Sequence, residues 1–227
     1  MGLRKKRDKT DIYGVRGDRP EAFRLPDARP NRSHSKNYHN YFRGYTEVRN
    51  VNEKGRRTIQ RFYTKPWIVS DLKGRNYWLV RLLYALLTSA SIFMYVFAMI
   101  QDIPANKHWV VAIPGLPAIV CLFLLTVMLV IYITVPRKMT LWDYESSTKR
   151  LKQMSIISAA VEGTTSIVIA GFTIVTGLEI RQSLICAGMD MAAAFCAAAI
   201  YFVENKVTYH EEPNETKLPA GELYEMR

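Results

Sequence analysis

Four apolar stretches, each about 20 residues long, occupy the middle of this chain of 227 residues. A helix of that length rises about 30 Å, which matches the hydrocarbon thickness of a bilayer. One soluble core of this size would not hold four such stretches, which disfavours a soluble fold with buried helices. We therefore expect an all-α membrane protein with four transmembrane helices in a bundle. The expected spans are residues 77–100, 109–135, 156–177 and 184–203.

The basic residues outside these spans are unevenly distributed. Residues 1–78 hold 20 Lys and Arg against 8 Asp and Glu, and the loop 136–155 holds five Lys and Arg. The loops 101–108 and 178–183 hold one basic residue each. Because basic residues stay on the cytoplasmic side, we expect both termini and the loop 136–155 in the cytoplasm. The compact loops and the lack of sorting motifs favour the plasma (inner) membrane of a bacterium.

Composition divides the remaining chain into three regions. Residues 1–37 are basic and poor in apolar side chains, which predicts a disordered tail. Its basic residues are either solvated charges that form part of the topology signal, which is the preferred interpretation, or a site for anionic lipid headgroups; nucleic-acid binding would need a folded basic face. Residues 38–76 form an aromatic juxtamembrane segment on the cytoplasmic side. Residues 204–227 form an acidic cytoplasmic tail, which either contacts the basic N-terminal region or remains solvated.

A β-hairpin is predicted within the juxtamembrane segment. Residues 45–51 and 58–64 have strand-like compositions, and Asn52–Gly55 between them is a turn signal. A lone hairpin is only marginally stable in water. We therefore expect it to rest on lipid headgroups, on the helices or on a partner.

Aromatic side chains mark the expected membrane interface at the start of the first span. Trp67, Tyr77 and Trp78 are amphipathic and suit the headgroup level. Arg81 lies a few residues deeper, where its long side chain either snorkels to the interface or reaches an acid on a neighbouring helix. It is the candidate charge partner for Glu162.

Two segments have irregular patterns. Pro114, Gly115 and Pro117 predict a turn or kink, with a regular helix running on from Pro117. The segment 137–153 contains both aromatic and charged residues, and it is either a short amphipathic piece or an ordinary loop.

Two acids, Glu162 and Asp190, lie within the third and fourth spans. An ionised group in hydrocarbon costs several kcal/mol unless it is paired, neutralised or hydrated. Helical rise separates the two by about 10 Å along the membrane normal, which is too far for direct contact. Three interpretations stay open: ion passage, a packing role, and a partner charge on another subunit.

Small residues accompany both acids. Ala159 and Gly163 are four residues apart on the third span, and Gly188 and Ala192 on the fourth. Such pairs let helix backbones approach closely in lipid. We expect these faces to pack against helices of the same chain or of a partner.

No motif predicts catalysis. The four histidines lie outside the spans without metal-ligand spacing, and no nucleophile elbow or phosphate-binding loop occurs. The three cysteines lie inside the spans without pairing or metal-binding spacing, which is typical of small core residues. We expect no cofactor and no metal.

These observations leave two functions open. The first is a non-enzymatic subunit or scaffold of a membrane complex, as a homo-oligomer or with a partner membrane protein. The alternative is a small transporter or ion-conducting component that uses Glu162 and Asp190 as titrating acids.

Overall fold

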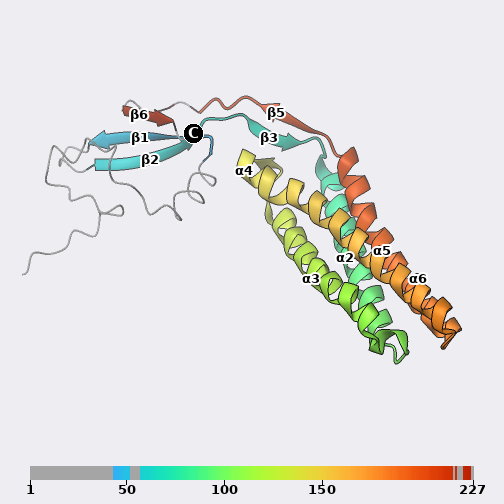
Figure 1. The fold of residues 1–227 in the computed structure, drawn as a ribbon. Coiled ribbons are helices and arrows are strands. Elements are labelled where there is room, and N and C mark those ends of the chain that lie inside the picture. The colour runs from blue at the N-terminus through green and yellow to red at the C-terminus, as the bar shows by residue number, and fades with distance from the viewer. Residues whose placement is uncertain (1–42, 52–56, 217, 219–221, 226–227) are drawn as a thin grey trace, which may run out of the picture. The chain divides into compact units, whose positions relative to one another are not determined.

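The computed structural model describes residues 43–51, 57–216, 218 and 222–225 (Figure 1). The chain divides into two compact units, one formed by Met1–Thr64 with Glu215–Arg227 and the other by Lys65–Asn214. The expected tail 1–37 and the turn Asn52–Gly55 lie outside the described residues.

The first unit is a three-stranded antiparallel sheet. β1 (Tyr45–Val51) pairs with β2 (Arg57–Tyr63), with Tyr45 opposite Tyr63, which confirms the predicted strands and their pairing. A third strand, β6 (Glu222–Glu225), pairs with the other edge of β1, so the order is β2-β1-β6. The acidic tail therefore contacts the juxtamembrane segment through backbone pairing, which is one of the two alternatives for that tail.

The third strand supplies what a lone hairpin lacks. A two-stranded hairpin leaves both outer edges and one face open to water, whereas a third strand makes β1 a central strand. Val48 of β1 is fully buried, and the side chain of Glu47 accepts a 3.0 Å hydrogen bond from Arg61 Nε of β2. This unit is therefore built from segments that precede and follow all of the long helices.

The second unit contains four long helices: α2 (Gly74–Ile100), α3 (Trp109–Thr134), α5 (Arg150–Thr176) and α6 (Ile180–Lys206). Each is long and apolar enough to cross a membrane, by length and composition. α5 packs along α6 and also against α3, while α2 packs against α6 and, less extensively, α3 (Figure 1).

The chain between α3 and α5 is mostly helical rather than an ordinary loop. A short helix, α4 (Leu141–Tyr144), passes through one π-helical segment, η3 (Glu145–Lys149), directly into α5. Thr140 and Asp143 form a reciprocal capping box that begins α4. The open question about segment 137–153 is thereby resolved in favour of a helical piece.

The kink expected at Pro114 and Pro117 does not delay the start of the second long helix. α3 begins at Trp109 and includes both prolines. The side chain of His108 caps it by accepting from the amide of Val110. Pro114 and Pro117 are the sixth and ninth residues of α3, so each forgoes the one intrahelical hydrogen bond that a backbone N–H at its position would have made.

A second small sheet gathers three separated segments at one end of the helices. β3 (Trp67–Ser70) pairs with β4 (Lys138–Met139) on one side and with β5 (Tyr209–Glu212) on the other. β3 precedes α2, β4 follows α3, and β5 follows α6. The opposite end is closed by a single 3-10 turn, η2 (Ala105–Lys107), and by Gly177, whose φ of 66° ends α5 in a left-handed cap.

Large apolar side chains cover the outside of the long helices, while the inward face of α2 is mostly polar. Exposed large residues such as Phe93, Phe123 and Phe195 cover the outside. On α2 the buried positions alternate at spacings of four and three, which is the pattern of a helix that packs along one stripe. Nearly all of these buried residues are polar or carry a hydroxyl: Arg81, Tyr84, Thr88, Ser91, Tyr95 and Ala98.

The pairing of β6 with β1 predicts a local effect of shortening the chain. Ending the chain at Thr216 removes β6, so backbone groups of Thr46–Arg49 lose their partners. We expect amide hydrogen exchange in β1 to become faster, while exchange in β3 stays unchanged as the internal control. Unchanged exchange in β1 would show that the third strand contributes nothing to this sheet.

Candidate functional site

Three acids are fully buried among the long helices. Glu162 lies on α5, and Asp190 and Glu204 lie on α6, each with 0% of its surface exposed. Asp190 and Glu204 are fourteen residues apart, which is two heptads, so they share one face of α6. Since a fully buried group has no contact with water, each carboxyl group depends on partners from the protein.

Glu162 has one such partner. The Ser91 hydroxyl of α2 lies 3.2 Å from Glu162 Oε2 and 3.1 Å from the backbone oxygen of Ala193 on α6. A hydroxyl has a single proton, so Ser91 cannot donate fully to both acceptors. Glu162 Oε1 is buried and has no hydrogen-bond partner among the described residues.

Asp190 has less. Both of its carboxyl oxygens are buried without a hydrogen-bond partner in the part of the chain that the structure describes. A Cβ added at Gly163 would lie 3.9 Å from the Cβ of Ala194, so these two residues face each other. Asp190 precedes Ala194 by four residues, which places it about 6 Å along α6 from that level. The two acids are thus one to two turns apart, close to the separation expected from the sequence.

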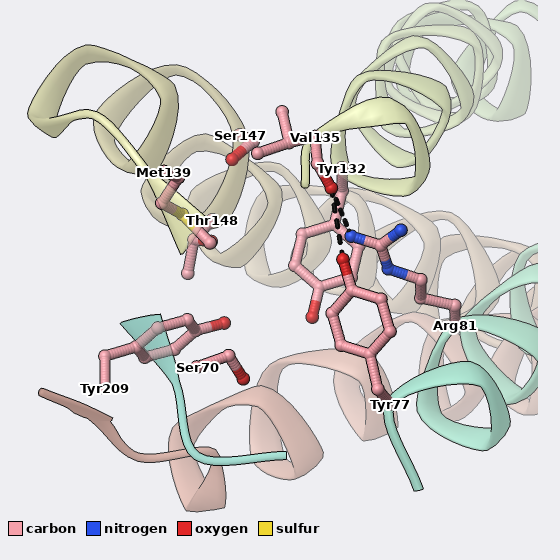
Figure 2. A pocket seen from close by; sticks show the side chains of 9 residues that line it. All are labelled: Ser70, Tyr77, Arg81, Tyr132, Val135, Met139, Ser147, Thr148 and Tyr209. Carbon is pink, nitrogen blue, oxygen red and sulfur yellow. Dashed lines mark hydrogen bonds between the residues drawn. The ribbon is translucent and has the colours of Figure 1, made fainter. Parts of the chain in front are cut away.

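The Arg81 side chain does not pair with Glu162 in the structure. Its guanidinium donates to the backbone oxygens of Ile133, at 2.7 Å, and Val135, where α3 ends. Figure 2 shows the Tyr77 hydroxyl meeting the same Val135 oxygen, at 3.2 Å. A cation at a helix C-terminus satisfies its last carbonyls and its dipole. Ser91, the partner of Glu162, lies ten residues further along α2, about 15 Å away.

Burial also bears on the idea that another subunit supplies the partner charge. Glu162 and Asp190 are both 0% exposed within the single chain. A side chain from a second chain could reach either one only if α2, α5 and α6 separated. The described geometry therefore gives no support to pairing across an interface.

Glu204 is the site residue that the sequence analysis missed, because the expected span ended at Val203. Oε2 accepts from Tyr84 of α2 at 2.7 Å and from Tyr132 of α3 at 3.1 Å, and Oε1 accepts from Tyr209 of β5 at 2.5 Å. Burial, together with the adjacent carboxylate, raises the pKa of the Tyr209 phenol, so it remains a donor. The fourteen-residue spacing from Asp190 was the signal that could have identified it.

A small cavity lies beside this cluster (Figure 2). Its volume of about 10 Å³ is close to the space that one water molecule needs. Arg81 Nε is buried there without a hydrogen-bond partner among the described residues. The cavity is lined by Ser70, Tyr77, Arg81, Tyr132, Val135, Met139, Ser147, Thr148 and Tyr209.

The candidate packing residues separate into two groups. Ala159 and Ala192 are half-buried, and Gly163 lies against Ala194 of α6. Gly188 is exposed, and a Cβ placed there would meet nothing within 4 Å. Gly163 therefore serves packing within the chain, whereas Gly188 faces outward.

The candidate interfacial aromatics lie at the end of the helices that carries the small sheet. Trp78, in the first turns of α2, is 63% exposed, while Tyr77 turns inward to α3. Trp67 of β3 is half-buried, and Lys138 Nζ lies 5.6 Å from the centre of its ring. This exposure fits Trp78 for the headgroup level.

The site contains no metal-binding cluster of the usual kind. Across the described residues, no group of three or more His, Cys, Asp and Glu side chains is placed to hold a metal ion. No known protein family, curated protein or solved structure matches this chain. Its function must therefore be argued from this geometry.

The Glu204 cluster makes a prediction about stability. Tyr84→Phe removes one of the three phenol donors while keeping the ring, and we expect it to cost about 1 kcal/mol, as for other hydrogen bonds between membrane helices. The measurement is thermal unfolding of the purified protein. Tyr201→Phe is the matched control, because no hydrogen bond from its hydroxyl is found in the described part. Equal effects of both changes would contradict a special role for Glu204.

Proposed function

We propose that this protein is a multi-pass integral membrane protein that acts as a non-enzymatic subunit or scaffold of a membrane complex. Its four long helices cross the plasma membrane of a bacterium, with both termini in the cytoplasm. The basic residues before α2 and between α3 and α5 support this orientation. The outward apolar side chains of all four helices support contact with lipid.

The observation that carries this proposal is the pairing of β1 with β6. It joins the segment before the first long helix to the segment after the last one in a single sheet. If the helices span the membrane, this pairing requires an even number of crossings and leaves the sheet on one side. The protein then offers a folded surface on one side and only short connections on the other, as suits a cytoplasmic docking platform.

The interior contacts support a structural role for most buried polar groups. Ser166 of α5 donates to the backbone of Ala187 on α6, and Tyr95 of α2 donates to the backbone of Gly115 on α3, both at 2.7 Å. Together with Glu204, they join all four helices. Interhelical hydrogen bonds of this kind fix helix positions in lipid.

The outward Gly188 provides a test of assembly. The full chain, purified in mild detergent from its native membrane, should run as a complex larger than its own 26.1 kDa. We expect Gly188→Leu to reduce that mass, because a bulky side chain would keep a neighbouring helix away. Gly171→Leu is the matched control, since Gly171 of α5 is also exposed with open space around it. A lone monomer in every sample would refute the subunit role.

A second function, a small transporter or ion-conducting component, is favoured by one observation. Within the described part of the chain, three buried oxygens of Glu162 and Asp190 have no hydrogen-bond partner, whereas an acid with a purely structural role would have its hydrogen bonds satisfied. Ionisable residues of this kind mark ion paths in many membrane proteins. In this function the two acids change charge as a proton or cation passes.

Flux measurements test this second function. In proteoliposomes, Glu162→Gln and Asp190→Asn should each abolish ion flux while the protein remains folded. Asp102→Asn is the control, because Asp102 is exposed and pairs with Lys107 outside the long helices. Flux that survives both interior substitutions would exclude the transport role.

A further inference from the structure

We propose that Glu162 and Asp190 hold a small monovalent metal cation, of which Na⁺ is the probe, inside the four helices. This inference concerns binding, and it holds whether the protein is a scaffold or a transporter. It rests on the geometry of the two carboxyl groups, on the oxygen atoms around them and on their complete burial.

A negative charge on either acid would have no counter-charge beside it among the described residues. Both acids are fully buried, and no ion pair involving either one occurs within the described residues. Glu162 and Asp190 lie one to two helical turns apart, so two negative charges at these positions would repel each other. One monovalent cation together with one proton would neutralise the pair, which removes the large cost of a bare charge in hydrocarbon.

Protonation alone does not satisfy Asp190. A protonated carboxyl group becomes a donor and still needs an acceptor for its O–H group. Neither oxygen of Asp190 meets such a partner in the described chain, and Glu162 Oε1 is in the same position. Three buried oxygens therefore lack the bonds that buried polar groups ordinarily make. A cation held between the two carboxyl groups, in direct contact or through a water molecule, would supply these oxygens with a partner.

The neighbouring polar atoms are oxygens, as a hard cation prefers. Ser91 Oγ touches both Glu162 and the backbone oxygen of Ala193. Tyr95 is buried on the same face of α2 as Ser91, and its own proton goes to the backbone oxygen of Gly115, which leaves its phenol oxygen able to coordinate a cation. The site thus offers carboxyl, hydroxyl and carbonyl oxygens from α2, α5 and α6.

Two further hydroxyls extend this polar interior by one helical turn. Thr88 lies three residues before Ser91 on α2, and Ser158 lies four residues before Glu162 on α5. Both are buried, and neither hydroxyl has a hydrogen-bond partner among the residues described. They provide oxygen atoms along a route between the acids and the end of the helices where Glu204 lies.

The ion class follows from the ligand count. Divalent Ca²⁺ takes six to eight oxygen ligands, several of them carboxylates, and Mg²⁺ retains water in an octahedral shell. The site has two carboxyl groups, and no larger acidic cluster occurs in the described chain. A monovalent ion needs fewer negatively charged ligands and a less rigid arrangement of them, which matches a site with two carboxyl groups and neutral oxygen atoms.

The experiment measures thermal unfolding of the full chain in detergent, at constant pH and ionic strength, in NaCl, KCl or choline chloride. A ligand at ten times its dissociation constant should raise Tm by about 3–5 °C for a chain of this size. We expect Na⁺ to raise Tm by this amount relative to choline. Equilibrium binding of radioactive ²²Na⁺ to the same sample should show a saturable site.

Variants locate the effect. Asp190→Asn and Glu162→Gln should each abolish the difference in Tm between Na⁺ and choline. Glu204→Gln is the matched control, because Glu204 is equally buried but receives three phenol hydrogen bonds. It should lower Tm in both salts and keep the difference between them.

Two results would overturn the proposal. The first is equal Tm in NaCl and choline chloride together with no saturable ²²Na⁺ binding by the wild-type chain, which does not depend on any variant folding. The second is a cation effect that persists in both Asp190→Asn and Glu162→Gln, because the ion would then bind elsewhere.

Discussion

The interior of the four long helices depends on one constraint: a buried polar group has no water to bond and must find its partner inside the protein. The buried stripe of α2 illustrates how this is met, because Arg81, Tyr84, Ser91 and Tyr95 donate to acids or backbone oxygens of other helices. Large apolar side chains cover the outside of all four helices, which are long and apolar enough to cross a membrane. In lipid, apolar side chains would gain little by burial, so polar contacts and close packing would hold these helices together.

The two kinds of buried acid show how far this constraint is met. Glu204 receives three phenol hydrogen bonds, from α2, α3 and β5, and thereby fixes the end of the helices next to the small sheet. Glu162 has one partner, and no hydrogen bond to Asp190 is found among the described residues. The contrast separates an acid with an evident structural role from two acids whose bonding is incomplete. Glu162 and Asp190, whose hydrogen bonding is incomplete, therefore form the candidate functional site.

Much of the architecture could be predicted from the sequence. Span length and hydropathy located four helices, and strand composition located the hairpin, since both patterns depend on local chemistry alone. The third strand, β6, was missed because its pairing with β1 joins residues far apart in the chain. Glu204 was assigned to the acidic tail because hydropathy falls near the end of α6, although its heptad spacing from Asp190 places it on the buried face. Arg81 was predicted as the charge partner of Glu162 because both were expected near the same membrane surface. In the structure α2 packs beside the end of α3, and Arg81 donates to the backbone oxygen of Val135 instead.

The sequence by itself determined the number of long apolar helices and the presence of two acids within them. These features follow from the composition of single segments, for which the periodicity of one helix is sufficient. Only the tertiary structure decided which polar groups meet: Ser91 with Glu162, three tyrosines with Glu204, and no described hydrogen-bond partner for Asp190. Such contacts depend on the axial offset and rotation of neighbouring helices, which are set by packing between segments and are not written in any one of them.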